Sequence, residues 1–133
     1  MSLVKLIDLP SLGDERGSLV AIESLSNVPF EIQRVYYIFG TEKGISRGFH
    51  AHKNLQQLAI CVAGKCRMLL DDGKTKESVW LTSPKQALII GENIWREMHD
   101  FSDDCVLLVL ASQHYDENDY IRDYSEFLRY VKC

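Results

Sequence analysis

The sequence predicts an all-β protein, a small barrel of short strands with one helix at its C-terminal end. About nine apolar runs, rich in β-branched and aromatic residues, follow one another at the spacing of roughly 8–12 residues that is typical of sandwiches and barrels. Helical periodicity is confined to the end of the chain, where apolar residues recur at three- and four-residue intervals. These residues are Tyr120, Ile121, Tyr124, Phe127, Leu128 and Val131.

The first part of the chain is expected to contain three strands. Residues 4–9 form the first, and a turn that carries Arg16 leads into residues 18–23, which are apolar almost throughout, as in a strand buried on both faces. After Pro29, residues 32–39 alternate as a strand. Tyr36 and Tyr37 then point to opposite faces, so at most one of them can face a common cavity.

The second part of the chain continues with short strands separated by turn residues. An Asp-Gly pair at Asp72 and Gly73 indicates a hairpin, and glycine, proline or aspartate separates the other runs. The expected strands cover residues 55–62, 66–70, 77–81, 87–90, 94–101 and 105–111. The C-terminal helix is expected to pack on the outside of the barrel.

Composition limits the possible functions. The 133 residues fit a single domain, residues 1–133, and the net charge of −4 with a pI near 5.5 argues against a nucleic-acid surface. No apolar run approaches the roughly 20 residues that span a bilayer, and no secretory signal is visible, so we expect a cytoplasmic protein without a membrane partner. The four cysteines, Cys61, Cys66, Cys105 and Cys133, lack CxxC spacing and are expected to be buried thiols rather than disulfides or a zinc site.

The most informative stretch lies between Gly44 and Gly64. His50 and His52 are separated by one residue, so on a strand both side chains point to the same side and form one chemical pair. Arg47 precedes them, and apolar strand residues follow. The pattern predicts a polar site inside the barrel.

The spacing of this stretch resembles the first motif of the cupin barrels. Gly44 is followed by five residues, the two histidines around one residue, four more residues, Gln57, six residues and Gly64. Metal-binding cupins have a glutamate at the Gln57 position and a further histidine in a second motif, where this sequence has Trp95. Two imidazoles are too few for a tight metal site. We therefore expect no metal, although His99 could in principle complete a ligand set.

Six runs spread over nearly the whole chain are similar to a more specific family. They cover residues 16–19, 29–38, 47–53, 95–98, 109–112 and 115–122. They resemble the dTDP-4-keto-6-deoxyglucose 3,4-ketoisomerases, nucleotide-sugar enzymes of the cupin class. The resemblance implies an isomerase without metal or cofactor that moves the keto group of a dTDP-linked 4-keto-6-deoxy sugar from C4 to C3 through an enediol intermediate.

The resemblance also implies roles for individual residues. His50 is expected to take the C3 proton and His52 to move or deliver protons, since an imidazole with a pKa of about 6.5 can both accept and donate protons at neutral pH. The substrate-facing residues are Tyr37 and Arg47 for the sugar oxygens and the enediolate, Arg16 and Arg96 for the diphosphate or the sugar, and Gln57 to orient a histidine or the sugar.

Three points stay open at the level of sequence. A related dTDP-sugar 3,5-epimerase would also remove a proton next to a keto group, and a non-catalytic cupin could bind the sugar nucleotide without turning it over. Arg16 resembles members that give a galacto product and Arg96 resembles members that give a gluco product; the neighbouring residues favour galacto. Exposed strand edges in a short barrel favour a homodimer.

Overall fold

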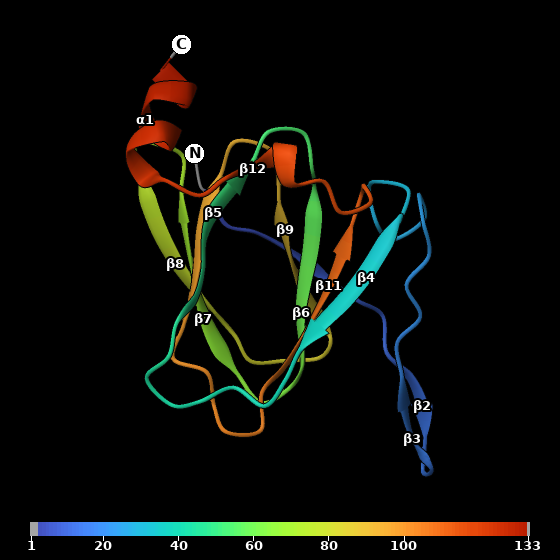
Figure 1. Ribbon diagram of the computed structural model, residues 1–133. Helices are drawn as coiled ribbons and strands as arrows, with labels where there is room; N and C mark the ends of the chain where they lie inside the picture. Colours follow the sequence, from blue (N-terminus) through green and yellow to red (C-terminus); the bar gives the residue numbers. More distant parts are fainter. Residues whose placement is uncertain (1–2, 133) are drawn as a thin grey trace.

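Two five-stranded sheets face each other and enclose the core (Figure 1). The computed structural model describes residues 3–132. One sheet has the order β1 (Lys5–Asp8), β9 (Gln86–Ile90), β6 (Gln57–Ala63), β11 (Val106–Ala111) and β4 (Arg34–Ile38). The other has the order β12 (Tyr120–Ile121), β5 (Arg47–His52), β10 (Trp95–His99), β7 (Cys66–Asp71) and β8 (Lys76–Leu81). The all-β prediction is confirmed.

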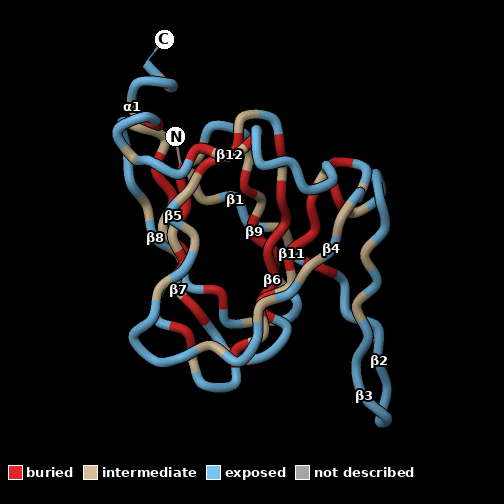
Figure 2. Tube along the Cα trace, viewed as in Figure 1, coloured by how far each residue is buried: buried red, intermediate tan, exposed pale blue. Residues whose placement is uncertain are grey.

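The core lies between the inner faces of the two sheets. Buried residues alternate along β7 and β11, where Met68 and Leu70 face Leu107 and Val109 in one apolar cluster. Figure 2 shows buried residues concentrated in the central strands of both sheets. The outer face of the first sheet is also covered, because the chain between Leu9 and residue 32 packs across it. This explains why β6 is buried at five successive positions.

A short hairpin replaces the buried strand predicted for residues 18–23. The hairpin consists of β2 (Leu12–Asp14) and β3 (Gly17–Leu19), and it projects away from the barrel in Figure 1. Leu12 and Leu19 are 62% and 57% exposed. The prediction was wrong because no second sheet within residues 3–132 covers this apolar run; of its residues, Val20 and Ile22 pack against the outer cluster.

The C-terminal segment contains less helix than its periodicity predicts. A 3-10 turn, η1 (Glu117–Asp119), leads into β12, and α1 (Tyr124–Lys132) begins only after Asp123 caps it through the backbone N–H groups of Ser125 and Glu126. Tyr120 and Ile121 are strand residues because they pair with the otherwise free edge of β5. No helix in residues 3–132 is long and apolar enough to cross a membrane.

The helix packs on the outside of the second sheet, as predicted. Phe127 is fully buried against Trp95, Ala51 and Ile121. Ala51 therefore faces outward, and the residues on either side of it in β5, His50 and His52, face inward.

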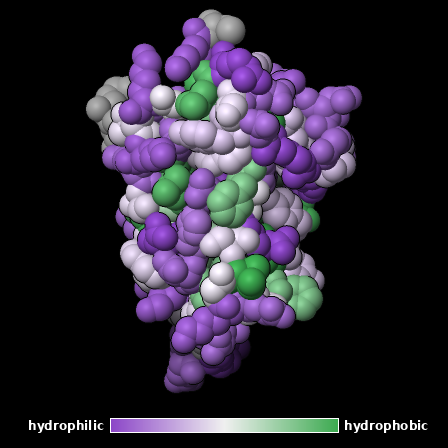
Figure 3. Space-filling model, turned by 60° about the vertical axis from the view of Figure 1, so that its left-hand side comes forward, coloured by the Kyte–Doolittle hydropathy of each residue, from purple (hydrophilic) through white to green (hydrophobic). Residues whose placement is uncertain are grey.

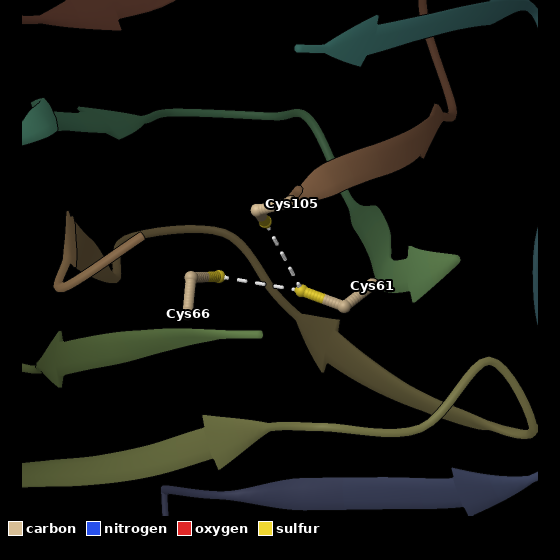
Figure 4. A group of neighbouring side chains, drawn as sticks. All are labelled: Cys61, Cys66 and Cys105. Atoms are coloured by element: carbon tan, nitrogen blue, oxygen red, sulfur yellow. Dashed lines mark hydrogen bonds between the residues drawn. The ribbon is translucent and has the colours of Figure 1, made fainter. Parts of the chain in front are cut away.

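Three cysteines form a buried cluster at one end of the core (Figure 4). The Sγ atom of Cys61 lies 3.5 Å from that of Cys66 and 3.8 Å from that of Cys105. The hydrogen bond from Cys66 and burial raise the pKa of the Cys61 thiol, and burial raises the pKa of Cys105 to about 12. The three described cysteines are thus buried free thiols, as expected; Cys133 lies outside the described residues.

Gly64 lies in the turn beside this cluster, and its replacement should lower the free energy of unfolding. Its φ is +66°, and a Cβ atom there would lie 2.8 Å from the Cα atom of Cys105. Gly40 offers a matched control, because its φ is +64° and a Cβ atom would contact nothing within 4 Å. We expect Gly40→Ala to lose about 1–2 kcal/mol of unfolding free energy and Gly64→Ala to lose clearly more. Equal urea midpoints for the two variants would contradict this account.

Candidate active site

Strand β5 places the two predicted histidines side by side inside the barrel. The ring centroids of His50 and His52 are 4.9 Å apart and the rings are nearly perpendicular, at 87°. A bulge opposite Arg96 and Glu97 interrupts the pairing of β5 with β10 just before His50. Phe49 takes up the extra residue with a φ of 57°, and Gly48 has a φ of +93°. Arg47 pairs with Met98 and His50 pairs with Arg96, two positions apart on β10, so the bulge brings Arg47 to the same face of the sheet as the histidines.

A cavity of about 670 Å³ opens next to this pair. It is bounded by β4, β5, β10 and β12, and His50 lies in its wall. Of the other predicted site residues, Arg47 and Tyr37 also line it. A volume of this size lies in the usual range for small-ligand sites, about 300–1,000 Å³.

His52 lies behind His50 and is held by a buried carboxylate. Its Nδ1 atom is 3.0 Å from Oδ2 of Asp119, and both side chains are almost fully buried. The other oxygen of Asp119 accepts the backbone N–H of Asn54 at 2.8 Å. Because a carboxylate only accepts hydrogen bonds, the proton of neutral His52 resides on Nδ1. Nε2 is then a free acceptor, and it is buried without a hydrogen-bond partner.

Both histidines are neutral at neutral pH. Burial first, and the Arg96 guanidinium second, lower the pKa of His50 to about 4 and that of His52 to about 2. A neutral imidazole has a lone pair that can take a proton. The resting site is therefore prepared to remove a proton from a ligand.

Arg96, Gln57 and Tyr36 form a buried network behind the cavity. Arg96 is fully buried and donates from Nη1 to Oε1 of Gln57, and from Nε and Nη2 to the carbonyl oxygen of Ile94. The Nε2 group of Gln57 in turn donates to the hydroxyl of Tyr36 at 3.2 Å. Arg96, which was expected to contact the diphosphate or the sugar, thus lies behind the cavity wall and is not among the residues that line the cavity.

The same network does not fit a metal ion. Gln57, at the position where metal-binding cupins have glutamate, turns its amide oxygen to Arg96, and that guanidinium adds a buried positive charge beside the histidines. His99 is engaged elsewhere, by Glu97 at 2.9 Å and Ser46 at 2.7 Å. Among residues 3–132, no cluster of metal-ligating side chains includes the two histidines.

Two predicted site residues lie further from the histidines than expected. Arg16 is at the tip of the projecting hairpin, 86% exposed and paired with Asp14. Tyr37 lies at the cavity rim, 61% exposed, with its ring 5.9 Å from that of Phe39. Because neighbouring residues of β4 alternate, Tyr36 takes the inward position.

The structure adds residues that sequence reasoning did not single out. The Tyr120 ring contacts both histidines, with centroids 5.1 Å from His50 and 4.3 Å from His52. Arg122 lies over that ring, 4.2 Å from its centroid, and pairs with Glu117. These residues belong to residues 115–122, one of the runs that resemble the family. The apolar residues from Tyr120 onward have helical periodicity, so the sequence did not predict that Tyr120 and Ile121 pair with β5.

The histidine pair predicts a specific pH dependence. A folded-state pKa of about 4 for His50, below the ordinary 6.5, means that the stability associated with neutral His50 is fully present above about pH 6.5 and is lost as the pH falls toward 4. We expect the thermal midpoint of the wild type to fall more steeply over this window than that of His50→Asn. Parallel curves for the two proteins would show that His50 titrates normally in the fold.

A neutral histidine pair inside a double-sheet barrel, held by a buried carboxylate and without a metal-ligand set, defines a cupin-type site for acid–base chemistry. The chain matches the family model described as FdtA, WxcM-like, C-terminal, over residues 2–132. It therefore belongs to this family.

Individual relatives agree with that assignment. A TDP-4-oxo-6-deoxy-alpha-D-glucose-3,4-oxoisomerase from Aneurinibacillus thermoaerophilus is 54% identical over 96% of this chain and 91% of its own length. The structure of WlaRB, a TDP-quinovose 3,4-ketoisomerase from Campylobacter jejuni, is 51% identical with a TM-score of 0.92, covering 97% of this chain and 99% of the other.

A further solved structure holds a sugar nucleotide. It is a histidine-to-asparagine variant of the 3,4-ketoisomerase QdtA from Thermoanaerobacterium thermosaccharolyticum in complex with TDP-4-keto-6-deoxyglucose. It is 42% identical with a TM-score of 0.96, covering 99% of this chain and 96% of the other. The cupin fold and the resemblance to 3,4-ketoisomerases predicted from the sequence are confirmed.

Proposed function

We propose that this protein is a 3,4-ketoisomerase that converts TDP-4-keto-6-deoxyglucose to the 3-keto sugar nucleotide. The observation that carries the proposal is the pair of neutral histidines at the wall of the cavity, His50 in contact with the open space and His52 behind it. The family's named activity supplies the substrate class.

The two histidines divide the proton transfers. His50 lines the cavity and is our choice for the base that takes the proton from C3, which lies next to the C4 carbonyl. The C3–H electrons form the C3–C4 double bond of an enediolate, and the carbonyl electrons move to O4. The proton then returns to C4 while the O3–H proton passes to O4, leaving the carbonyl at C3. His52, with Nε2 free as an acceptor, serves the exchange between the oxygens.

The mouth of the cavity suits a diphosphate. Arg47 and Arg122 line it with exposed side chains, and a guanidinium pairs with phosphate oxygens through two parallel donors. Arg122 already has Glu117 as a partner, so Arg47 is the freer of the two cations. The nucleotide end of the substrate then lies near the exposed start of β5, where Arg47 is located.

Deuterium labelling separates this proposal from its rivals. With the 4-keto sugar nucleotide in deuterated buffer, a 3,4-ketoisomerase places no deuterium at C5, whereas a 3,5-epimerase labels C3 and C5. A non-catalytic cupin would bind the compound with saturation and return it unlabelled and unchanged. Deuterium at C5 with the carbonyl still at C4 would replace our proposal with epimerisation.

We also propose the galacto configuration at C4 of the product. The proposal rests on the sequence around Arg16 and Met98, which resembles galacto-type members, whereas the named substrate class of WlaRB, a quinovose, favours the gluco configuration. Proton NMR of the product decides between them, because H4 is equatorial and weakly coupled to H5 in the galacto isomer. A large H4–H5 coupling would reverse the assignment.

A homodimer is the third part of the proposal. Exposed apolar side chains lie on the projecting hairpin, on edge strand β4 and directly after that strand, namely Leu12, Leu19, Val35, Tyr37 and Phe39. On the face shown in Figure 3, apolar residues occur only as small separate areas among hydrophilic ones. A second copy that covers the hairpin would bury this surface and would place Arg16 near the cavity of that second copy. A monomer by light scattering would contradict it.

A further inference from the structure

One side chain of the cavity wall has no role in the networks described so far. Arg34 begins β4, and its guanidinium lies against two tyrosine rings, with Cζ 5.4 Å from the Tyr36 centroid and 5.7 Å from the Tyr115 centroid. Its Nε and Nη2 atoms are buried and have no hydrogen-bond partner. Within residues 3–132, the only other buried side-chain nitrogen or oxygen in this condition is Nε2 of His52. All of these unpartnered atoms belong to the same site.

Unpartnered charged donors are expensive inside a protein. A buried polar group without a partner costs about 1–3 kcal/mol, and a charged group costs more. The tyrosine rings stabilise the charge of Arg34 through their faces, but they accept no hydrogen bond from its Nε or Nη2 atoms. A ligand in the cavity that Arg34 lines would supply the missing acceptors.

The position of Arg34 indicates which part of the ligand it meets. Arg47 and Arg122 have exposed side chains at the mouth, whereas the free donors of Arg34 are buried. The guanidinium is also close enough to the buried groups to help lower the pKa values of His52 and Tyr36, although burial raises the Tyr36 pKa overall. A ligand whose diphosphate lies at the mouth would therefore meet Arg34 with its sugar end.

We propose that Arg34 is a catalytic residue that holds the two reacting oxygens of the sugar, O3 and O4, with its Nε–H and Nη2–H groups. The inference rests on the proposed function, because that reaction produces two adjacent oxygens that share one negative charge in the enediolate. The Nε and Nη2 edge of a guanidinium is a rigid two-donor fork that matches two adjacent oxygens. The charge develops where the fork points, so the contact is strongest at the enediolate.

Arg34 complements the histidines in this scheme. A guanidinium carries only hydrogen-bond donors and no acceptor, so Arg34 serves the oxygens by donating hydrogen bonds. The same two contacts serve the 4-keto substrate and the 3-keto product, which differ only in which oxygen carries the hydrogen. His50 and His52 remain the groups that move protons.

Binding measurements test the contact without relying on turnover. We expect Arg34→Met to weaken the binding of TDP-glucose, which carries both O3 and O4, by about tenfold or more, and to leave the binding of TDP unchanged. Arg67→Met is the matched control, because Arg67 is a strand arginine that pairs with Asp100 on the other side of β10, and it should change neither affinity. Equal weakening of TDP and TDP-glucose, or no weakening of either, would overturn the inference.

Turnover tests the catalytic part. Arg34→Lys keeps the charge but loses the fork, and we expect kcat to fall about 100-fold with KM nearly unchanged. Arg34→Ala should regain activity with added guanidinium and not with added methylammonium, which a purely structural role would not produce. A wild type that does not isomerise the substrate would refute the proposed function, while the selective loss of TDP-glucose binding would still establish the Arg34 contact.

Discussion

His50→Asn should keep the fold and lose isomerisation by about 10³-fold, within the range of about 10²–10⁴ typical of a lost general base. Asparagine fills a similar volume and can still hydrogen-bond, but it has no lone pair basic enough to remove a carbon-bound proton. His50 is the histidine in the cavity wall, so the loss should be in kcat, with binding of TDP unchanged. The measurement is steady-state turnover combined with calorimetric titration of TDP.

His114→Asn is the matched control for this experiment. His114 is exposed and does not line the cavity, so its variant should be as active as the wild type. A fully active His50→Asn variant would show that the base lies elsewhere in the site, and His52 would then be the first candidate.

Asp119→Asn should lower kcat by about 100-fold through its effect on His52. The carboxylate accepts two N–H donors at once, from His52 and from the backbone of Asn54. A carboxamide has a single oxygen, so its NH₂ group must face one of these donors or force the proton of His52 from Nδ1 to Nε2. In the second case the free acceptor that the mechanism needs is lost.

The Asp119 variant has a distinctive signature. Asp119 acts as a positioning residue, so binding of TDP should be unchanged, and Asp119→Glu should recover part of the loss in kcat. Asp103→Asn, at an exposed turn, serves as the control. An Asp119→Asn variant with wild-type kcat would show that the tautomer of His52 is not important for the reaction.

Much of the fold follows from local pattern. The period-two alternation in residues 47–52 already required His50 and His52 to share a face, and the motif spacing from Gly44 to Gly64 identified the barrel. Both features depend on strand geometry, which is a property of neighbouring residues. The same reasoning fails for residues 18–23. A strand is buried on both faces only if other parts of the chain cover both of them, and an apolar run does not show whether they do.

The site is only partly visible in the sequence for a similar reason. Asp119 and Tyr120 reach the histidines because β12 pairs with β5 across 68 positions, from His52 to Tyr120. The three- and four-residue period of apolar residues in the same segment predicted a helix. Tyr120 and Ile121 instead form a strand, because they pair with the free edge of β5. Arg34 lies in the resembling run of residues 29–38, but nothing in that run singled it out; the absence of an acceptor around its buried donors does.

Tyr36 and Arg96 show how burial changes a prediction. The alternation of Tyr36 and Tyr37 was clear, but the sequence does not say which face of β4 meets the barrel interior. The guanidinium of Arg96 was expected to contact the diphosphate or the sugar, whereas it is enclosed by Gln57 and the Ile94 carbonyl and lowers the pKa values of the histidines through its charge. Such a role depends on how deeply the side chain is buried, and a single sequence does not reveal the burial of an individual arginine.

The position of the carbonyl tests the central proposal most directly. TDP-4-keto-6-deoxyglucose labelled with ¹³C at C4 is incubated with the purified protein and followed by carbon NMR. We predict that the labelled carbon changes from a carbonyl, with its hydrate, to a hydroxyl-bearing carbon, while a new unlabelled carbonyl forms at C3. A label that stays in the carbonyl after prolonged incubation with folded protein would contradict the proposed 3,4-ketoisomerisation.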